Sequence, residues 1–184
     1  WDNLKFNLEG INEVKRKFFG TLQNTYSFFS LYANLDNFDY KSSFIDIKYR
    51  PEIDRWIISK LNSLISNVDK CYSDYEPTKA GRLIQAFTVD DLSNWYVRLC
   101  RKRFWKGEIN DDKLAAYQTL YSCLKTVSIL SAPIAPFYSD LLYNDLMKSN
   151  TGDETSVHLS NFPSVKKDNV DLILEKKMDL GQQI

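Results

Sequence analysis

The sequence has few of the residues from which catalytic and cofactor sites are usually built. Its one histidine is His158, and its three cysteines, Cys71, Cys100 and Cys123, lack the C-x-x-C spacing of a zinc or redox site. The six glycines form neither G-x-x-x-x-G-K-S/T nor G-x-G-x-x-G, so no phosphate-binding loop is indicated. We therefore expect no catalytic residue, no metal site and no cofactor within these 184 residues.

The sequence also lacks net charge and long apolar runs. It has 24 basic and 24 acidic side chains, a balance that argues against a general nucleic-acid coat but allows a local basic patch. No apolar run reaches the ~18 residues of a membrane span and no signal peptide opens the chain, so we expect no membrane partner and a reducing, cytoplasmic location. Because the first residue is Trp1, we expect the sequence to be a fragment of a longer protein.

Apolar residues at helical spacing, by contrast, run along nearly the whole sequence. Between Glu9 and Ala33 they recur every three or four residues, and the same pattern follows Pro51 and Pro77. Pro77 opens the longest predicted helix, which we expect Gly107 to stop. Two more helices are predicted, one over residues 111–130 with Asp111 or Asp112 as its N-cap and one over residues 137–147. A polar loop (148–156), an extended segment (156–163) and a charged amphipathic tail (171–184) are expected to follow. The expected fold class is all-α, a mostly antiparallel helix bundle with one long central member.

The end of that long helix, Asp90–Gly107, reads DDLSNWYVRLCRKRFWKG. At ~100° per residue it divides into two faces. The first should pack in the core and contains Leu92, Trp95, Tyr96 and Leu99. The second gathers cations, an amide and an exposed indole, namely Asn94, Arg98, Arg101, Lys102 and Trp105. Cationic side chains bind phosphate oxygens and a flat aromatic ring can stack on an unpaired base, so the second face is a candidate RNA contact.

Arg103 projects into the apolar face of the same helix, where a guanidinium group needs a carboxylate or several carbonyls. It is therefore a weaker RNA-contact candidate, and structural pairing is the competing explanation. The other cations have a structural explanation too, because basic residues in a last turn stabilise the helix dipole by about 0.3–1 kcal/mol each. Helical geometry alone leaves open an RNA-binding face and a protein-interaction module such as an adaptor or subunit interface.

Several longer segments carry a family resemblance. They are WDNLKFNLEGINEVKRKFFGTLQNTYSFFSLYAN, EIDRWIISKLNSLI, DDLSNWYVRLCRKRFW, LSAPIAPFYSDLLY and HLSNFP. Together they cover most of residues 1–163 and resemble, in the same order, the anticodon-binding domain of isoleucyl-tRNA synthetases, which are class I aminoacyl-tRNA synthetases. L-S-N-W-Y followed by R-x-R-F-W favours the isoleucine enzymes over the related valine enzymes, which stay the alternative.

The resemblance implies a helical anticodon-binding domain over residues 1–163 and the start of a C-terminal helical extension over residues 164–184. Its partner would be the anticodon stem-loop of tRNA-Ile, and the RNA would be contacted by Asn94, Arg98, Arg101, Lys102, Trp105 and, less strongly, Arg103. In the full-length enzyme, ATP with magnesium would activate isoleucine, and the enzyme's own catalytic domain would adjoin this one. The signatures of that catalytic domain and the editing domain are missing here, so the fragment itself is expected to be non-catalytic.

Overall fold

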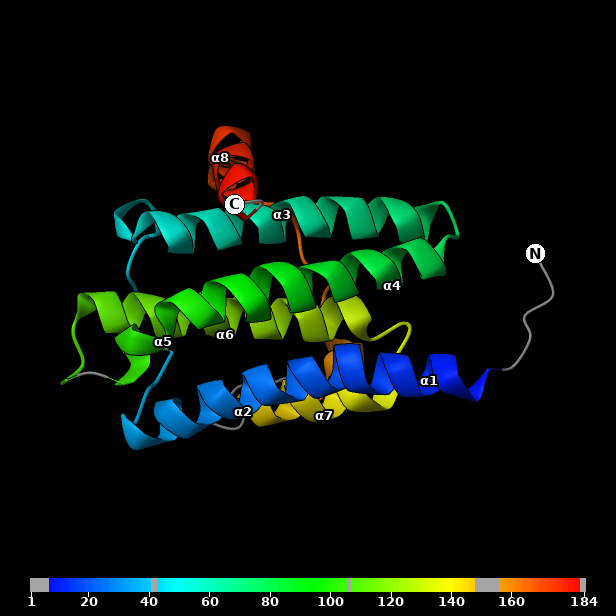
Figure 1. Cartoon of the computed structure of the whole chain (residues 1–184), viewed down its shortest axis with the longest axis horizontal. Coiled ribbons are helices and arrows are strands. Elements are labelled where there is room, and N and C mark those ends of the chain that lie inside the picture. The colour runs from blue at the N-terminus through cyan, green and yellow to red at the C-terminus, as the bar shows by residue number, and fades with distance from the viewer. Residues whose placement is uncertain (1–6, 41–42, 106, 148–155, 183–184) are drawn as a thin grey trace.

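The computed structural model describes residues 7–40, 43–105, 107–147 and 156–182, which form the expected all-α bundle (Figure 1). The α-helices are α1 (Leu8–Val14), α2 (Gly20–Leu35), α3 (Glu52–Ser73), α4 (Pro77–Ala86), α5 (Arg98–Trp105), α6 (Asp111–Ser131), α7 (Pro136–Met147) and α8 (Leu172–Gln182). The π-helical segments η1 (Lys15–Phe19) and η3 (Phe87–Val97) join α1 to α2 and α4 to α5. Single 3₁₀ turns make up η2 (Ile47–Tyr49), η4 (Val157–Leu159) and η5 (Lys167–Asn169).

The long helix predicted to open at Pro77 is confirmed. It runs without a break through α4, η3 and α5 and ends at Trp105. Pro77 is its first residue, where a missing backbone N–H costs nothing. Gly107 has φ +68°, in the left-handed region that glycine enters without penalty. The prediction that the helix stops at Gly107 is therefore confirmed as well.

Helix α6 is the central element of the bundle. It packs against α2, α3, α5 and α7, and most of its residues are buried all the way round (Figure 1). The sequence predicted Asp111 or Asp112 as its N-cap, and this is wrong. Asn110 caps the helix instead, because its backbone is extended and its Oδ1 accepts a hydrogen bond from the backbone N–H of Lys113 at 2.8 Å.

The segment predicted as extended, 156–163, begins with the 3₁₀ turn η4 rather than with extended chain. Asp140 of α7 causes this turn. Its Oδ1 accepts hydrogen bonds from the hydroxyl of Ser156 at 2.7 Å and from the backbone N–H of Val157 at 2.9 Å. Val157 is thereby held in a small buried cluster beside α6 and α7.

Helix α8 crosses α3 at a steep angle (Figure 1). Glu175 accepts hydrogen bonds from the hydroxyls of Ser59 and Ser63, and Leu174 is buried beside them. Lys60 of α3 lies between Asp179 of α8, at 3.2 Å, and Asp91 of η3, at 3.6 Å. The hydrogen bonds and ion pairs of α8 lie at the edge of the bundle, while Leu174 joins the main core, most of which lies between α2, α3, η3, α5 and α6. The boundary predicted at residue 163 stays a prediction.

A carboxylate at the end of α2 ties that helix to α6. Asp36 accepts a hydrogen bond from the hydroxyl of Tyr117 and forms an ion pair with Lys113. Burial opposes the charge of Asp36, but the two donors outweigh burial and hold its pKa below the ordinary 3.8. The contact therefore stabilises the fold above the ordinary pKa and is lost as the pH falls through the lower value in the folded state.

We expect an Asp36→Asn variant to be less stable than the unaltered chain at pH 7, by about 1–3 kcal/mol, because charged hydrogen bonds are lost. The variant should also lose less of its remaining stability between about pH 4 and pH 2, since the titrating group is gone. Urea unfolding at several pH values measures both effects. Asp74→Asn, an exposed position at the end of α3, is the control. Equal acid sensitivity of the two variants would contradict the assignment.

Within the part of the chain that the structure describes, none of the helices combines the length and the apolar character needed to cross a bilayer.

Candidate nucleic-acid interface

A row of exposed cationic side chains runs along α5. Arg98, Arg101 and Lys102 are all exposed, and the Trp105 side chain is 54% exposed. Positions separated by three, four and seven residues share one side of an α-helix, so these four side chains lie on the same face. Asn94, one turn earlier in η3, is exposed as well. We call these five residues, Asn94, Arg98, Arg101, Lys102 and Trp105, the α5 stripe.

The cations of the α5 stripe are free of carboxylate partners among residues 7–40, 43–105, 107–147 and 156–182. The ion pairs of this region use other cations, such as Lys60 and Arg103, and leave Arg98, Arg101 and Lys102 in solvent. An ion-pair role would require such a partner, whereas stabilisation of the helix dipole needs none. Exposed cations beside an exposed indole also suit phosphate contact and base stacking.

The buried side of the same helix differs from the predicted one. Leu92 and Tyr96 are buried as expected, but Leu99 is 53% exposed and Trp95 is only half-buried. The core positions after Tyr96 are Val97, Cys100 and Phe104. The cause is the π-helix η3, which needs more residues per turn than the α-helix assumed in the prediction and so rotates α5 relative to the residues before it. A step of four residues, from Tyr96 to Cys100 to Phe104, then marks most of the buried face.

Arg103 does not belong to the α5 stripe, because its guanidinium group points into the bundle. Its Nη1 and Nη2 donate to Oδ1 and Oδ2 of Asp54 at 2.7 and 2.8 Å, a bidentate pair. Its Nε donates to Asp112 Oδ2 at 3.0 Å, and Nη2 also donates to the Asp112 backbone carbonyl at 2.8 Å. The sequence required a carboxylate for this arginine, and α3 supplies it. All three nitrogens of Arg103 are thus engaged inside the protein.

The pair is completed by Tyr96, whose hydroxyl donates to Asp54 Oδ1 at 2.7 Å. Burial lowers the pKa of Arg103, but the hydrogen bonds and charge of Asp54 outweigh burial and raise the pKa above its ordinary value. Burial, with Asp54 adding to it, raises the pKa of Tyr96 well above its usual range, so the hydroxyl stays a donor. Burial also raises the pKa of Cys100 to about 11, so this thiol stays protonated and is not a nucleophile at neutral pH.

Asp54 is the residue of this site that the sequence analysis did not name. It is fully buried, although it is an acid in the first turn of α3. A signal for it existed in the sequence. Asp54 stands three, four and seven residues before Ile57, Ile58 and Leu61, which places a carboxylate on the apolar face of α3. An acid on the apolar face of one helix and an arginine on the apolar face of another together indicate a buried ion pair.

The described residues hold no group of three or more histidine, cysteine, aspartate or glutamate side chains arranged to bind a metal ion. Asp91, which follows Asp90 in the helix, forms an ion pair with Lys60. Burial outweighs that ion pair and raises the pKa of Asp91 above its ordinary value. What the site offers chemically is therefore positive charge, hydrogen-bond donors and one exposed ring on a rigid helix.

Comparison with known proteins places this arrangement in a family. Residues 54–184 match the family described as the anticodon-binding domain of tRNA ligase, and the chain belongs to that family. Its curated relatives include the isoleucine–tRNA ligase of Cytophaga hutchinsonii, which is 65% identical over 185 residues, covering 100% of this chain and 17% of the relative. The isoleucine–tRNA ligases of Bacteroides thetaiotaomicron and Porphyromonas gingivalis are 60% and 59% identical over the whole chain, which covers 16% of each.

The resemblance to the anticodon-binding domain of isoleucyl-tRNA synthetases is thereby confirmed, and these relatives favour the isoleucine enzymes over the valine alternative. The chain spans about one sixth of the length of the curated relatives it matches. The part it spans is helical and contains the segment that matches the anticodon-binding domain.

Proposed function

We propose that this domain binds the anticodon stem-loop of tRNA-Ile as part of an isoleucine–tRNA ligase. The observation that carries the proposal is the α5 stripe, a face with an exposed indole and cations that lack a carboxylate partner among the described residues, in a member of an anticodon-binding family. In a chain of zero net charge, this concentration of unpaired positive charge on one helix face supports a local polyanion contact.

Each residue of the stripe has a proposed role. Arg98, Arg101 and Lys102 bind phosphate oxygens of the loop, because phosphates are the commonest hydrogen-bond acceptors on a nucleic-acid surface. Trp105 stacks on an unpaired base of the loop, a contact worth about 1–3 kcal/mol. Asn94 offers an amide that can both donate to and accept from a base edge.

For Arg103 we propose a positioning role in place of the direct RNA contact that was its weaker alternative. Its bonds to Asp54 and Asp112 tie the end of α5 to α3 and to the first turn of α6. The stripe is carried on this end of α5, so the pair holds the RNA-binding side chains in a fixed orientation and reduces the entropy lost on binding.

The remaining parts of the proposal concern the full-length protein. There the catalytic domain adjoins this one and uses ATP with magnesium to activate isoleucine, in the cytoplasm. Residues 164–184, which include α8, begin a C-terminal helical extension of the anticodon-binding domain 1–163. No metal or nucleotide is assigned to the present residues.

An Arg98→Ala or Arg101→Ala variant of the full-length enzyme should bind tRNA-Ile more weakly while isoleucine activation by ATP is unchanged. Each lost phosphate contact should also lower the slope of log affinity against log salt by about one unit. Filter binding over a range of salt concentrations measures the affinity for tRNA-Ile and its salt slope. Isoleucine-dependent pyrophosphate exchange measures the activation of isoleucine by ATP.

Two results would contradict this proposal. Loss of pyrophosphate exchange in step with tRNA binding would mean that the variant damages the whole enzyme. An unchanged affinity and salt slope, with the fold intact, would leave the cations with the helix-dipole role and favour a protein-interaction module.

A further inference from the structure

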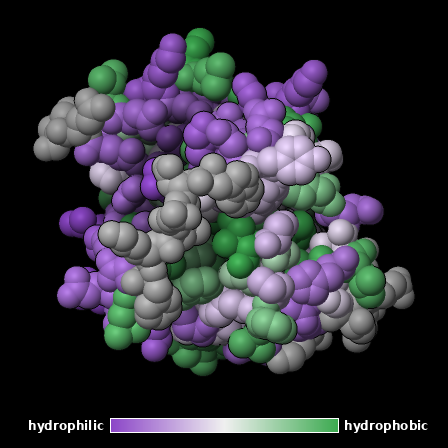
Figure 2. Space-filling model, turned by 90° about the vertical axis from the view of Figure 1, so that its right-hand side faces the viewer, coloured by the Kyte–Doolittle hydropathy of each residue, from purple (hydrophilic) through white to green (hydrophobic). Residues whose placement is uncertain are grey.

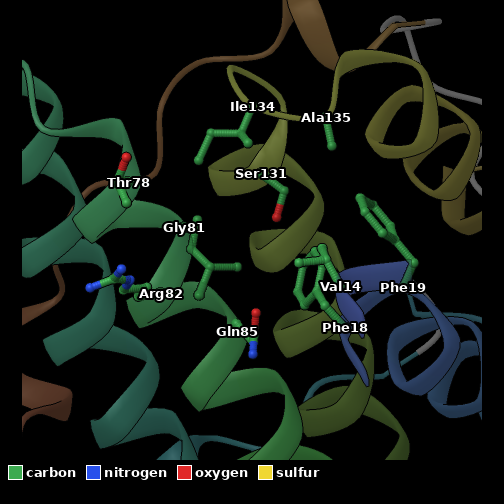
Figure 3. Close-up of a pocket in the computed structure, with 11 residues that line it drawn as sticks. Val14, Phe18, Phe19, Thr78, Gly81, Arg82, Gln85, Ser131, Ile134 and Ala135 are labelled. Carbon is green, nitrogen blue, oxygen red and sulfur yellow. The ribbon is translucent and has the colours of Figure 1, made fainter. Parts of the chain in front are cut away.

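An apolar groove lies at the end of the bundle opposite the α5 stripe. Val14 and Phe18 form one wall, Gly81 and Ile84 of α4 form another, and Ser131 and Ile134 close it at the turn between α6 and α7 (Figure 3). Its volume is about 310 Å³, enough for one or two large side chains. Figure 2, which faces this end, shows apolar residues flooring a hollow between polar ones. The groove and the stripe lie about 30 Å apart along one continuous helix, from Gly81 to Lys102.

The surface beside the groove is also apolar and uncovered. None of the residues of α1 is buried, although Leu8, Ile11 and Val14 recur at helical spacing on it. Ile11, Val14 and Ile134 are 50%, 43% and 46% exposed. An amphipathic helix whose apolar side meets solvent lacks the packing that stabilises helices in proteins, so this side of α1 needs a partner.

One polar atom of the groove also lacks a partner. Ser131 is buried, and its Oγ has no hydrogen-bond partner among the described residues. Figure 3 shows the hydroxyl pointing into the middle of the groove rather than toward the surrounding helices. A buried hydroxyl left unsatisfied costs about 1–3 kcal/mol, so the groove suits an occupant that is mostly apolar and carries one hydrogen-bonding group.

We propose that this groove, with the apolar side of α1, is the surface on which the polypeptide preceding residue 1 packs in the full-length protein. An apolar side chain fills the groove and a polar group of the same segment meets Ser131 Oγ. The inference rests on the proposed function, which makes the chain one domain of a longer ligase.

Two observations select this occupant. The chain spans only about one sixth of the length of its curated relatives, so such a protein has long segments outside this domain that can pack on its surface. Helix α1 begins at this same end of the bundle (Figure 1). RNA does not fit, because the groove offers a single charged residue, Arg82, and is far from the stripe.

Hydroxyl-radical footprinting of the full-length protein, without tRNA, tests the proposal. Ile11, Val14 and Ile134 should be protected from oxidation. Leu99 and Trp105, whose exposure in this domain is similar, should be oxidised. Oxidation of the first three at the rate of Leu99 would overturn the proposal. Protection that appears only with tRNA would assign the groove to RNA, and protection that vanishes on dilution would assign it to a second copy; either result overturns it.

A matched pair of variants at Gly81 gives a second reading. A Cβ there would lie 3.4 Å from Ile134 Cδ1, an ordinary contact, so Gly81→Ala leaves the groove open and serves as the control. Gly81→Leu places a larger side chain in the groove without adding charge, and should restore oxidation of Ile11 and Val14. Protection that survives in Gly81→Leu would overturn the proposal. The Arg98→Ala experiment tests tRNA binding at the other end of the bundle. The proposed packing in the groove can therefore fail while the proposed tRNA binding stands, and the reverse is also possible.

Discussion

Replacing Asp54 with alanine is expected to lower the free energy of unfolding by about 3–5 kcal/mol, the usual result of removing one partner of a buried ion pair. The Arg103 side chain is 15% exposed, so its guanidinium group would keep its charge in a site from which water is largely excluded. Tyr96 would lose its acceptor in the same step. Denaturant unfolding followed by far-ultraviolet circular dichroism measures the loss.

Two comparisons separate the buried pair from ordinary surface charge. Asp112 also bonds to Arg103 but its side chain is 52% exposed, so Asp112→Ala should cost no more than about 1 kcal/mol. The double variant Asp54→Leu/Arg103→Met removes both charges and should be clearly more stable than Asp54→Ala alone. If Asp54→Ala lost no more stability than Asp112→Ala, the structural role given to the pair would be wrong.

Neutralising three cations of the stripe together should nearly abolish tRNA binding by the full-length enzyme. In the variant Arg98→Ala/Arg101→Ala/Lys102→Ala, each lost phosphate contact should reduce the salt slope by about 0.7–0.9, so the total reduction is about 2–3. Affinity should fall about a hundredfold or more at low salt, because each charged contact contributes on the order of 1–2 kcal/mol. Exposed side chains carry the change, so stability should be little altered.

The control for this variant has the same change in net charge. Lys166, Lys167 and Lys176 are exposed cations outside the stripe. Their joint replacement by alanine also lowers the net charge by three, so it reproduces any general loss of electrostatic attraction. A similar loss of affinity in both triple variants would mean that tRNA responds to overall charge and does not contact the stripe.

The two expected effects act on opposite sides of one helix. Asp54 and Arg103 hold the inner side of α5 against α3, while the stripe presents its outer side to solvent. A partial loss of the inner contact should therefore weaken RNA binding without removing any RNA-binding side chain. Asp54 is thus expected to matter for tRNA although it is buried and carries the same sign of charge as the RNA.

The helices themselves were predictable because their causes are local. Apolar spacing, Pro77 at a helix start and Gly107 at a helix end act over a few residues and need no tertiary contact. The exposed members of the stripe were predictable for the same reason, since charged side chains on a helix remain in solvent unless something pairs with them.

The rotation of α5 was not predictable in this way. A π-helical stretch satisfies fewer good hydrogen bonds than an α-helix and persists only where packing favours it. Here η3 is held between α2 and α3, and it decides that Cys100 and Phe104 are buried and Leu99 is not. A helical wheel drawn at a constant angle cannot include a change that the neighbouring helices impose.

By itself, then, the sequence determined the helix bundle, the family and the positive face of one helix, because periodicity, caps and charge are properties of neighbouring residues. Only the tertiary structure decided that Arg103 leaves that face to join Asp54, 49 residues earlier in the chain. It also decided that an apolar groove forms among η1, α4 and the α6–α7 turn. Contacts between distant segments depend on how the helices pack, and packing is set by the whole core at once.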